Sequence, residues 1–378
     1  MRLCRVFPTF QTEFQYYEHY LSKELQKRGV RTTFITSDRI EPAWENFLRD
    51  RTAFKTGYAE YADFDVYRVK CISILGKPIP IRLSRLKRIL RSGNFDVYHF
   101  SGIGSFFNFV VLRMIGRVGH HHSVFISDHS NPSEANTTLI GRAYYRLLAF
   151  LFGFFRDRIR RVFVPNQGSE RLIKARYGLD ASQVKIIPLG YDADTFRYIP
   201  GVRDPDGDLV IGFAGKINAR KSIEKLLRAV AALPTLRIRV LVVGAAQNDP
   251  YVEKLMTYVA GHRLNVEFRP LISSPRDLAE FYNYIDLAVF PGSISITTLE
   301  ATACGTPVII YRSMEGLENR VADGRGHLFS TEEELIRLIE SYDGVVTDRQ
   351  RIAQNSRSFS WTRISARYFE EYVGAGVG

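Results

Sequence analysis

Short runs of consecutive apolar residues alternate along this chain with segments in which apolar residues recur every three or four positions. Runs of the first kind are typical of buried strands, and segments of the second kind are typical of amphipathic helices. In the first half a helix is expected over residues 16–28, because Tyr17, Leu21 and Leu25 share one face and Gly29 is a stop signal. Strands are expected at residues 3–7, 30–36, 96–100, 123–127, 162–165 and 184–188.

A polar stretch rich in Gly, Pro and Asp, residues 200–208, has the composition of a linker, and the alternation restarts after it. Strands are expected at 209–214, 237–244, 266–268, 287–290 and 307–311, and a helix at 222–233. A chain of 378 residues usually forms about two domains. We therefore expect an α/β protein with two Rossmann-like, doubly wound domains at residues 1–198 and 207–358. A final helix at 360–375 is expected to pack back on the first domain.

Composition and cysteine usage narrow the class of protein. Hydrophobic residues make up 45% and charged residues 24% of the chain, which excludes a mainly disordered or fibrous protein. Cys4, Cys71 and Cys304 are few and widely separated, so we expect no disulfide framework, no metal-ligand set and a reducing cytosol. The N-terminus lacks the apolar stretch of a signal peptide, and no window reaches the roughly 18 apolar residues that span a bilayer. We expect a cytoplasmic protein that does not cross a membrane.

The formal charge of +12 is distributed unevenly along the chain. Residues 1–200 carry 31 basic and 18 acidic side chains, a net charge of +13, and the remainder carries 21 and 22, a net charge of −1. The second half must therefore recognise its partner by placed groups and not by bulk charge.

Two stretches of the basic half combine cations with apolar residues. Residues 81–91 place Leu83, Leu86 and Leu90 at helical spacing among arginines and lysines, and residues 142–161 interleave arginines with aromatic residues. The aromatic residues are Tyr144, Tyr145, Phe150, Phe152, Phe154 and Phe155. This combination suits an anionic membrane surface, although the apolar sides also suit a protein core. Nucleic acid is the rival partner, but no nucleic-acid fold pattern accompanies the patch, so none is expected.

The segment 299–309 reads as a helix, a Gly turn and a buried strand that follow a loop rich in hydroxyl groups. The helix begins where the loop offers backbone N–H groups, and such a terminus suits a diphosphate. Glu300 lies in the first helical turns, where a carboxylate can accept hydrogen bonds from ribose hydroxyls. An N-capped structural helix, with Glu300 favoured by the helix dipole, explains the pattern equally well. The loop residues expected at the ligand are Ser293, Ser295, Ile296 and Thr297.

Gly215, Lys216 and Lys221 lie between a predicted strand and a predicted helix. Two cations at such a turn, beside the positive end of a helix dipole and without a carboxylate on the same turn, are typical of a phosphate clamp. Solvated surface lysines are the alternative, and the pairing favours the clamp. Neutralisation of phosphate by these lysines makes a metal unnecessary, so we expect neither a metal nor a cofactor.

Several segments together resemble the retaining glycosyltransferases of family 4, which have the GT-B fold of two Rossmann-like domains facing each other across a cleft. The resemblance extends over residues 1–372 and implies that Lys216 and Lys221 hold the diphosphate of a nucleotide-sugar donor, while Glu300 holds its ribose. It also implies that His129, which follows a predicted strand, contacts the transferred sugar and the leaving phosphate. On the residues alone, a lone histidine at a strand end is more typical of capping or packing. The segments that carry the resemblance are 126–131, 187–196, 215–222, 241–244, 285–291, 299–309 and 359–361.

Three positions depart from the family's pattern. The family usually has two glutamates separated by seven residues, and the first of them falls on Gly292 here, where Ser293 or Ser295 could substitute. Ser222 replaces a family glycine, and residues 8–17 lack the family's Gly pair. The identity of the donor sugar therefore does not follow from the resemblance.

Two other motifs imitate metal sites. His120, His121 and His122 are consecutive, and consecutive residues of a strand point in opposite directions, so we interpret them as a solvated loop. Asp63 and Asp65 form an Asp-x-Asp triplet, which we interpret as a turn before a strand.

The function expected from the residues and the resemblance is a metal-independent hexose transfer with retained configuration. The donor is a nucleotide-diphosphate sugar, and the acceptor is a lipid-linked or glycan precursor of the cell surface. The protein is expected at the cytoplasmic face of the membrane, held peripherally through its basic N-terminal domain. Two alternatives stay open: a nucleotide-sugar epimerase or phosphorylase on the same fold, and a non-catalytic module that binds nucleotide sugars or lipids.

Overall fold

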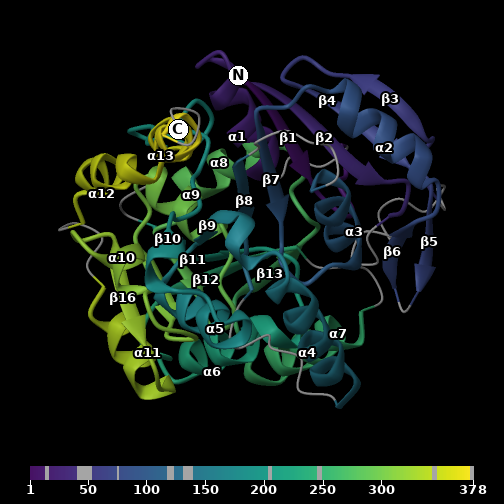
Figure 1. Cartoon of the computed structure of the whole chain (residues 1–378). Helices are drawn as coiled ribbons and strands as arrows, with labels where there is room; N and C mark the ends of the chain where they lie inside the picture. The colour runs from purple at the N-terminus through teal and green to yellow at the C-terminus, as the bar shows by residue number, and fades with distance from the viewer. Residues whose placement is uncertain are drawn as a thin grey trace. The chain divides into compact units, whose positions relative to one another are not determined.

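The computed structural model of the chain describes residues 1–12, 17–40, 53–74, 76–116, 123–130, 139–202, 207–244, 249–342 and 347–374. The chain divides into two compact units, and each is built on a mainly parallel sheet with helices (Figure 1). The first unit comprises Met1–Pro188 and Ile364–Gly378, and the second comprises Leu189–Arg363. The predicted α/β class with two Rossmann-like halves is confirmed.

The first unit contains an eight-stranded sheet in the order β10-β9-β8-β7-β1-β2-β4-β3, parallel except for the edge strand β3. The strands are β1 (Arg2–Val6), β2 (Arg31–Ser37), β3 (Gly57–Glu60), β4 (Phe64–Val69), β7 (Val97–Ser101), β8 (Ser123–Ser127), β9 (Ile159–Val164) and β10 (Val184–Ile186). A hairpin of β5 (Cys71–Ile74) and β6 (Lys77–Pro80) stands beside the sheet. The helices are α1 (Tyr17–Gln26), α2 (Leu83–Ser92), α3 (Phe106–Ile115), α4 (Leu139–Gly153), α5 (Gln167–Tyr177) and most of α13 (Trp361–Val373).

Local signals explain where these helices begin and end. α5 begins after Asn166, whose side chain accepts a hydrogen bond from the backbone N–H of Ser169 over 2.9 Å. It ends at Gly178, whose φ of +61° closes the last turn without the strain that a side chain would bring. α1 ends before Gly29, as the sequence predicts.

The Asp-x-Asp triplet is a structural feature of the first sheet. Asp63 lies in a bend directly before β4, as expected, whereas Asp65 already belongs to that strand. Asp65 is buried, forms an ion pair with Arg31 over 3.0 Å and accepts a hydrogen bond from the Tyr58 hydroxyl over 2.9 Å. Within the described ranges, no group of three or more His, Cys, Asp or Glu side chains could hold a metal ion. His120, His121 and His122 lie outside the described residues.

The second unit contains a six-stranded, all-parallel sheet in the order β13-β12-β11-β14-β15-β16. Renumbered along the unit, this is the doubly wound order 3-2-1-4-5-6. The strands are β11 (Leu209–Ala214), β12 (Ile238–Val243), β13 (Val266–Arg269), β14 (Leu287–Phe290), β15 (Val308–Tyr311) and β16 (Gly326–Phe329). The helices are α6 (Ile223–Ala231), α7 (Pro250–His262), α8 (Pro275–Tyr284), α9 (Thr297–Ala303), α10 (Glu318–Val321), α11 (Glu332–Glu340) and α12 (Arg349–Ser356).

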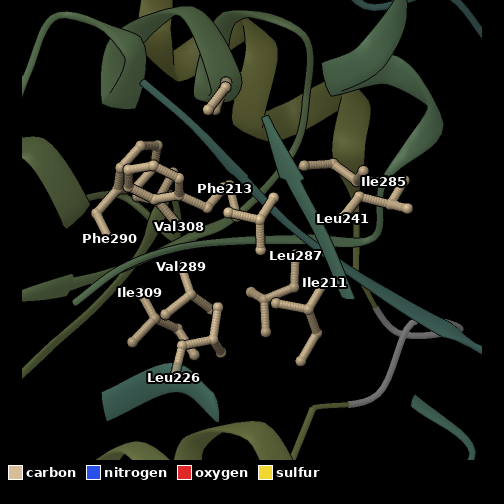
Figure 2. Close-up of a cluster of buried hydrophobic side chains, with 14 of the residues drawn as sticks. Ile211, Phe213, Leu226, Leu241, Ile285, Leu287, Val289, Phe290, Val308 and Ile309 are labelled. Atoms are coloured by element: carbon tan, nitrogen blue, oxygen red, sulfur yellow. The ribbon is translucent and has the colours of Figure 1, made fainter. Parts of the chain in front are cut away.

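The core of the second unit lies on its central strands. Apolar side chains of β11, β12, β14 and β15 meet those of the covering helices (Figure 2). Burial on both faces explains why these strands appear in the sequence as unbroken apolar runs. The residues labelled in the figure are Ile211, Phe213, Leu226, Leu241, Ile285, Leu287, Val289, Phe290, Val308 and Ile309.

The C-terminal helix α13 joins the first unit through a buried polar network. The imidazole of His99, on β7, contacts the Tyr372 hydroxyl over 2.5 Å and the Ser127 hydroxyl over 2.8 Å. Glu371 adds an ion pair with Lys185 over 2.6 Å. Burial holds the pKa of His99 well below its usual range, so this histidine acts as a neutral hydrogen-bonding group.

The aromatic residues of 142–161 do not share one surface. Phe150 and Phe154 are 65% and 67% exposed, whereas Phe152 and Phe155 are buried in the core and the two tyrosines are half-buried. Phe152 and Phe155 therefore belong to the core, which is the alternative that the sequence left open, and Phe150 and Phe154 stay exposed. The helical period of α4 turns Phe150 outward and Phe152 inward. None of the helices in the described ranges combines the length and apolarity needed to cross a bilayer.

Candidate functional site

The centre of the second sheet positions the candidate site. β11 and β14 are neighbours there, although two strands and three α-helices separate them in sequence. The carboxyl ends of two such strands form the topological switch point at which doubly wound sheets bind ligands. Residues 215–222 leave β11 at this point, and residues 291–296 leave β14. The two segments singled out from the sequence therefore lie together.

Direct contacts hold these two loops against each other. The backbone N–H of Ser293 donates to the carbonyl oxygen of Arg220 over 2.9 Å, and the Lys221 ammonium donates to the Ser293 carbonyl oxygen over 2.7 Å. Gly292 is so close that an added Cβ would lie 2.3 Å from the Arg220 carbonyl oxygen. No side chain fits at position 292 without moving the backbone of the neighbouring loop.

A second close approach shapes the start of the β11 loop. Gly215 and Gly244 follow β11 and β12, with φ values of +152° and +117°. A Cβ on Gly244 would lie 2.0 Å from the Gly215 carbonyl oxygen. Glycine is thus required where these two strand ends meet, and Gly215 brings Lys216 onto the surface at the carboxyl edge.

The lysine loop closes with a strained residue. Lys216 is exposed and Lys221 is half-buried at the end of a short 3₁₀ turn, residues 219–221, which the side chain of Asn218 caps. Ser222, which stands where the resembling family has glycine, adopts a φ of +51°. A left-handed conformation costs a residue with a Cβ roughly 1–2 kcal/mol.

The loop before α9 offers fewer groups than the sequence predicts. The expectation that the Ser293 N–H is available to a ligand is wrong, because it donates to Arg220. The hydroxyls of Ser295 and Thr297 are hydrogen-bonded to each other. Ile296 occupies the N-cap position of α9 with helical dihedral angles and no capping side chain. The backbone groups of Ser295, Ile296 and Thr297 remain the candidates for contact with an anion.

Glu300 is the chemically distinctive residue of this unit. Its side chain is buried, and Oε2 has no hydrogen-bond partner among the described residues. Burial, together with the negative charge of Asp192, raises the pKa of this carboxyl to about 8. A buried carboxyl oxygen without a partner costs stability, and a hydrogen-bond donor next to it would remove that cost.

Sequence reasoning missed a buried cation next to α9. Arg320, on α10, is buried and donates to the Thr298 hydroxyl over 3.2 Å. Burial and the nearby Arg325 lower the pKa of Arg320 to about 10. Thr298 in turn donates to the Ser295 carbonyl oxygen over 3.0 Å, so the pair stiffens the first turn of α9. The arginine has no sequence signal, because only the fold brings residues 298 and 320 together.

In the first unit, His129 follows β8 at the carboxyl edge of the sheet. Both oxygens of the preceding residue, Asp128, accept backbone hydrogen bonds, from Ile103 over 2.8 Å and from Ser130 over 2.9 Å. The His129 ring lies 4.7 Å from that of Tyr17, centroid to centroid. Burial and the charge of Arg5 outweigh Asp128 and lower the pKa of His129 to about 4. The imidazole is therefore neutral near pH 7.

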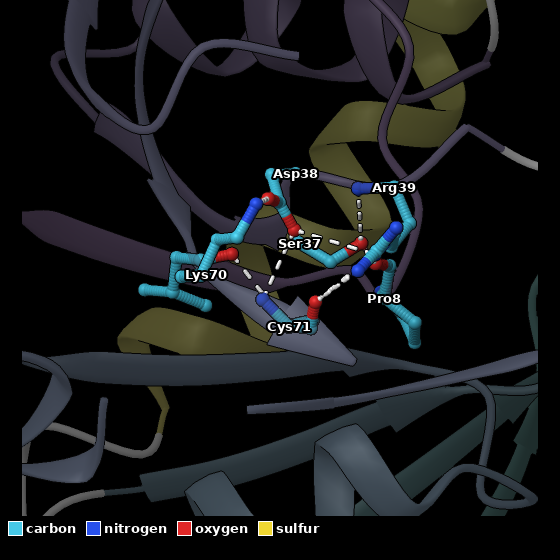
Figure 3. Close-up of polar contacts among 7 residues, drawn as sticks. Pro8, Ser37, Asp38, Arg39, Lys70 and Cys71 are labelled. Atoms are coloured by element: carbon cyan, nitrogen blue, oxygen red, sulfur yellow. Dashed lines mark hydrogen bonds and ion pairs between the residues drawn. The ribbon is translucent and has the colours of Figure 1, made fainter. Parts of the chain in front are cut away.

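A polar network at the same edge of the first sheet anchors the β5–β6 hairpin (Figure 3). The buried Asp38 carboxylate accepts the Cys71 N–H over 3.0 Å and pairs with Lys70 over 2.9 Å. Arg39 donates to the Cys71 carbonyl oxygen over 2.6 Å. The two cations compensate a buried charge, so this network is structural.

Within the N-terminal loop, residues 8–17, positions 13–16 lie outside the described residues.

Two protein-family models match adjacent parts of this chain. The family described as Glycosyltransferase Family 4 matches residues 15–195, and the family described as Glycosyl transferases group 1 matches residues 195–359. A D-inositol 3-phosphate glycosyltransferase of Rhodococcus erythropolis is 31% identical over 229 residues, which cover 53% of this chain and 50% of that protein. The chain thus matches about half the length of these curated relatives.

Solved structures share the fold over nearly the whole chain. Sucrose-phosphate synthase from Thermosynechococcus elongatus superposes with a TM-score of 0.70 at 17% identity, covering 99% of each chain. Anabaena HepE in complex with UDP superposes with a TM-score of 0.71 at 15% identity, covering 99% of this chain and 100% of that one. Together, the two adjacent family matches, the relatives and the shared fold show that the chain belongs to the family 4 glycosyltransferases of the GT-B fold.

Proposed function

We propose that the protein transfers a sugar from a nucleotide-diphosphate sugar to an acceptor hydroxyl with retention of the anomeric configuration. One observation carries the proposal: the lysine loop and the loop before α9 are locked together by Lys221, Ser293 and Gly292 at the switch point of the second sheet. A site with two lysines beside backbone N–H groups suits a diphosphate. The UDP complex of the HepE structure supports a nucleotide as the ligand.

The proposed chemistry is stabilisation of a leaving group. When the bond between the sugar's anomeric carbon and the β-phosphate oxygen breaks, negative charge develops on the diphosphate. Lys216 and Lys221 neutralise this charge, and the amides of residues 295–297 donate to the phosphate oxygens. Fixed donors of this kind supply a large share of the rate in many enzymes, because they need no reorganisation as the charge appears. No metal is needed in this scheme.

Glu300 is proposed to hold the ribose of the donor. Ribose hydroxyls would donate to the carboxylate and supply the partner that Oε2 lacks among the described residues. Two such hydrogen bonds favour the charged form, so the pKa of Glu300 falls when nucleotide binds. Binding of the ribose and loss of the carboxyl proton are therefore coupled.

The donor sugar is proposed to be recognised without the first family carboxylate. Position 292 has no space for a side chain, so Glu300 is the glutamate of the motif that can contact the donor. The hydroxyls of Ser295 and Thr297 already form a pair that can turn toward a sugar. Hydroxyl groups hold sugar hydroxyls by weaker, neutral hydrogen bonds than a carboxylate does, which favours a permissive sugar site.

His129 is proposed to contact the transferred sugar and the leaving phosphate from the first unit. A neutral imidazole can donate one hydrogen bond and accept another, so it can orient a sugar hydroxyl without adding charge. This role rests on the family resemblance of residues 126–131 and on the neutral state of the ring.

The acceptor is proposed to be lipid-linked, with the protein held on the cytoplasmic face of an anionic membrane. α4 exposes Leu147 and Phe150, and Phe154 is exposed just after its end, in the same part of the chain as the exposed Arg142 and Arg146. An apolar stripe flanked by cations lies in the interface of anionic bilayers. The name of the curated relatives favours a second candidate acceptor, an inositol phosphate.

The experiment that tests this function is a transfer assay with a panel of UDP- and GDP-sugars and with two acceptor classes, polyprenyl phosphate in vesicles and inositol phosphate. We expect one donor to raise the thermal unfolding temperature and to yield a product whose anomeric configuration equals that of the donor. An inverted product would contradict retention. Conversion of the donor in the absence of any acceptor would favour an epimerase, and donor binding without any product would favour a binding module.

A further inference from the structure

A second pocket opens on the unit that carries the proposed donor site. Its volume is about 560 Å³, and it reaches Ala303, the last residue of α9. The proposed donor loops lie at the first residue of the same helix, Thr297. The pocket is thus separated from the donor site by the length of α9. Its other walls are the segment 191–200 and one face of α12.

The face of α12 that lines the pocket is polar. Gln350, Gln354 and Arg357 follow at intervals of four and three residues, so their side chains lie on one side of the helix and its continuation. Ile352 and Ser356, on another side, are buried in the unit. α12 therefore packs with one side and presents donors to the pocket with the other.

The opposite wall is aromatic. Tyr191, Phe196 and Tyr198 line the pocket, and Arg197 lies among them. The ring of Tyr191 is buried, and the Arg357 cation opposes the rise in the pKa of its hydroxyl, to about 12, that burial causes. The Tyr191 hydroxyl and the Arg357 guanidinium are therefore neighbours.

The charge of the pocket is one-sided. Two arginines line it, and none of its described lining residues is Asp or Glu. A guanidinium can bind two oxygens of a phosphate group at once, and the neighbouring glutamine amides can donate to the same group. With no carboxylate among the described lining residues, these two arginines are suited to bind a phosphate. Tyr191 and Phe196 are buried and Tyr198 is half-buried, so Tyr198 is the aromatic face of this wall on which a ring can stack.

The pocket is preformed by hydrogen bonds that leave its polar side chains available. The Tyr191 N–H donates to the Phe359 carbonyl oxygen over 3.0 Å, and the Trp361 N–H donates back to the Tyr191 carbonyl oxygen over 2.9 Å. Asn283 holds the other end of the wall, because it accepts from the Ile199 N–H over 2.7 Å. These bonds fix the two segments through which the chain passes from one unit to the other, at 188–189 and 363–364.

We propose that this pocket is an accessory site for a ring-bearing phosphate monoester, with the phosphate on Arg197 and Arg357 and the ring against the aromatic wall. The site goes beyond the proposed transfer reaction, since it shares no residue with the donor loops. A ligand there joins α12 to the segment 191–200, so it braces both crossover segments and makes the pocket a point of control by a phosphorylated metabolite.

The test is isothermal titration calorimetry of the full-length protein with four probes: glucose 6-phosphate, adenosine 5′-monophosphate, inorganic phosphate and glucose. We expect one of the two phosphate esters to bind. Glucose, which has a ring without a phosphate, and inorganic phosphate, which has no ring, should bind much more weakly. Which ester binds tells a sugar phosphate from a nucleotide. Equal binding of inorganic phosphate and both esters would contradict the aromatic wall, and no binding of any ester would overturn the proposal.

Matched variants assign the binding to the pocket. Arg357→Gln and Arg197→Gln should each weaken the ester roughly tenfold or more, since each removes a charge-assisted hydrogen bond. Arg351→Gln makes the same change on α12 outside the pocket and should bind like the wild type. All three arginines are exposed, and thermal unfolding checks that the variants fold.

A donor-site variant separates this proposal from the proposed function. Lys221→Ala should keep full affinity for the ester, and loss of ester binding in that variant would place the ester in the donor site and overturn the proposal. Conversely, failure of the wild type to bind any nucleotide sugar would contradict the transfer reaction and leave the ester result standing.

Discussion

The ammonium group of Lys221 lies 2.7 Å from the carbonyl oxygen of Ser293, so a side chain of the lysine loop donates to the backbone of the loop before α9. This bond gives the cation an acceptor and holds the ammonium at the loop that leads into α9. In the proposed reaction, a diphosphate would replace the carbonyl oxygen as acceptor and would find the lysine already in position. Preorganisation of this kind lowers the cost of binding.

Gly292→Ala should destabilise the protein by roughly 1–3 kcal/mol, because the new methyl group meets the Arg220 carbonyl oxygen at 2.3 Å and forces the loops apart. Urea unfolding measures the change. Gly261→Ala, inside α7 with nothing within 4 Å of the added Cβ, is the matched control and should stabilise by up to about 1 kcal/mol. Equal stability of Gly292→Ala and the wild type would refute the close approach.

Ser222→Gly should stabilise the protein by about 0.5–1 kcal/mol. Glycine removes the strain at a φ of +51°, which stabilises the folded state. Because glycine also has more conformational entropy in the unfolded chain, the net stabilisation is smaller than the strain energy. The serine side chain makes no N-cap hydrogen bond to α6, so little capping is lost. Denaturant unfolding of the two proteins decides the sign, and a destabilised Ser222→Gly would show that the hydroxyl matters more than the backbone.

Glu300 should make the stability of the nucleotide-free protein fall as the pH rises. Its pKa is about 8 in the folded state, against an ordinary value near 4.5, so between these values the folded protein holds a proton that the unfolded chain has lost. Stability falls by at most roughly 1.4 kcal/mol per pH unit in this window. Glu300→Gln should remove this slope in urea titrations at pH 6.5 to 8, above the range in which His129 contributes with the opposite sign, whereas the exposed Glu280→Gln should retain it. A wild-type slope that survives in Glu300→Gln assigns the pH dependence to another group.

His129 should stay neutral across the physiological range. Because its pKa is about 4, the folded protein binds its proton only well below the pH at which the unfolded chain does, so this histidine costs stability as the pH falls from about 6.5 toward 4. NMR titration of the imidazole resonances, assigned with His129→Asn, measures this directly. A midpoint near 6.5 would contradict the neutral state of the ring.

Phe150→Ser and Phe154→Ser should weaken retention of the protein on vesicles that contain anionic lipid. Both rings are exposed, Phe150 on α4 and Phe154 just after it, and would be buried in the lipid interface. Liposome flotation provides the measurement, and Met256→Ser, at an apolar residue of the second unit that is 52% exposed, serves as the control. If the wild type does not float with anionic vesicles, the membrane proposal fails.

The sequence predicted most of the central strands, since burial on both faces leaves unbroken apolar runs such as those of β11 and β14. It also predicted that residues 215–222 and 293–300 serve one site, through a family pattern. It did not predict that Gly292 touches Arg220, because that contact depends on the approach of segments 72 residues apart. The Thr298–Arg320 and His99–Tyr372 contacts were not predicted either, because each joins residues that only the fold brings together.

For residues 142–161 the sequence left open whether the aromatic side chains lie on the surface or in the core. Composition alone groups all six aromatic residues, whereas the period of a helix separates Phe150 and Phe154 from Phe152. The helical periodicity of the sequence, unlike its composition, predicts that Phe150 and Phe154 are exposed. The strain at Ser222 was likewise visible only in part, as a serine where the family has glycine.

The most direct test of the account is nucleotide release from the preferred nucleotide sugar, measured with the wild type, Lys221→Ala and Lys254→Ala. Lys254 is exposed on α7 of the same unit and controls for the loss of one positive charge. We expect Lys221→Ala to release nucleotide at least roughly a hundredfold more slowly than the wild type, because it lacks one charge-stabilising donor. Lys254→Ala should release nucleotide at the wild-type rate. Equal release by wild type and Lys221→Ala would contradict the diphosphate clamp.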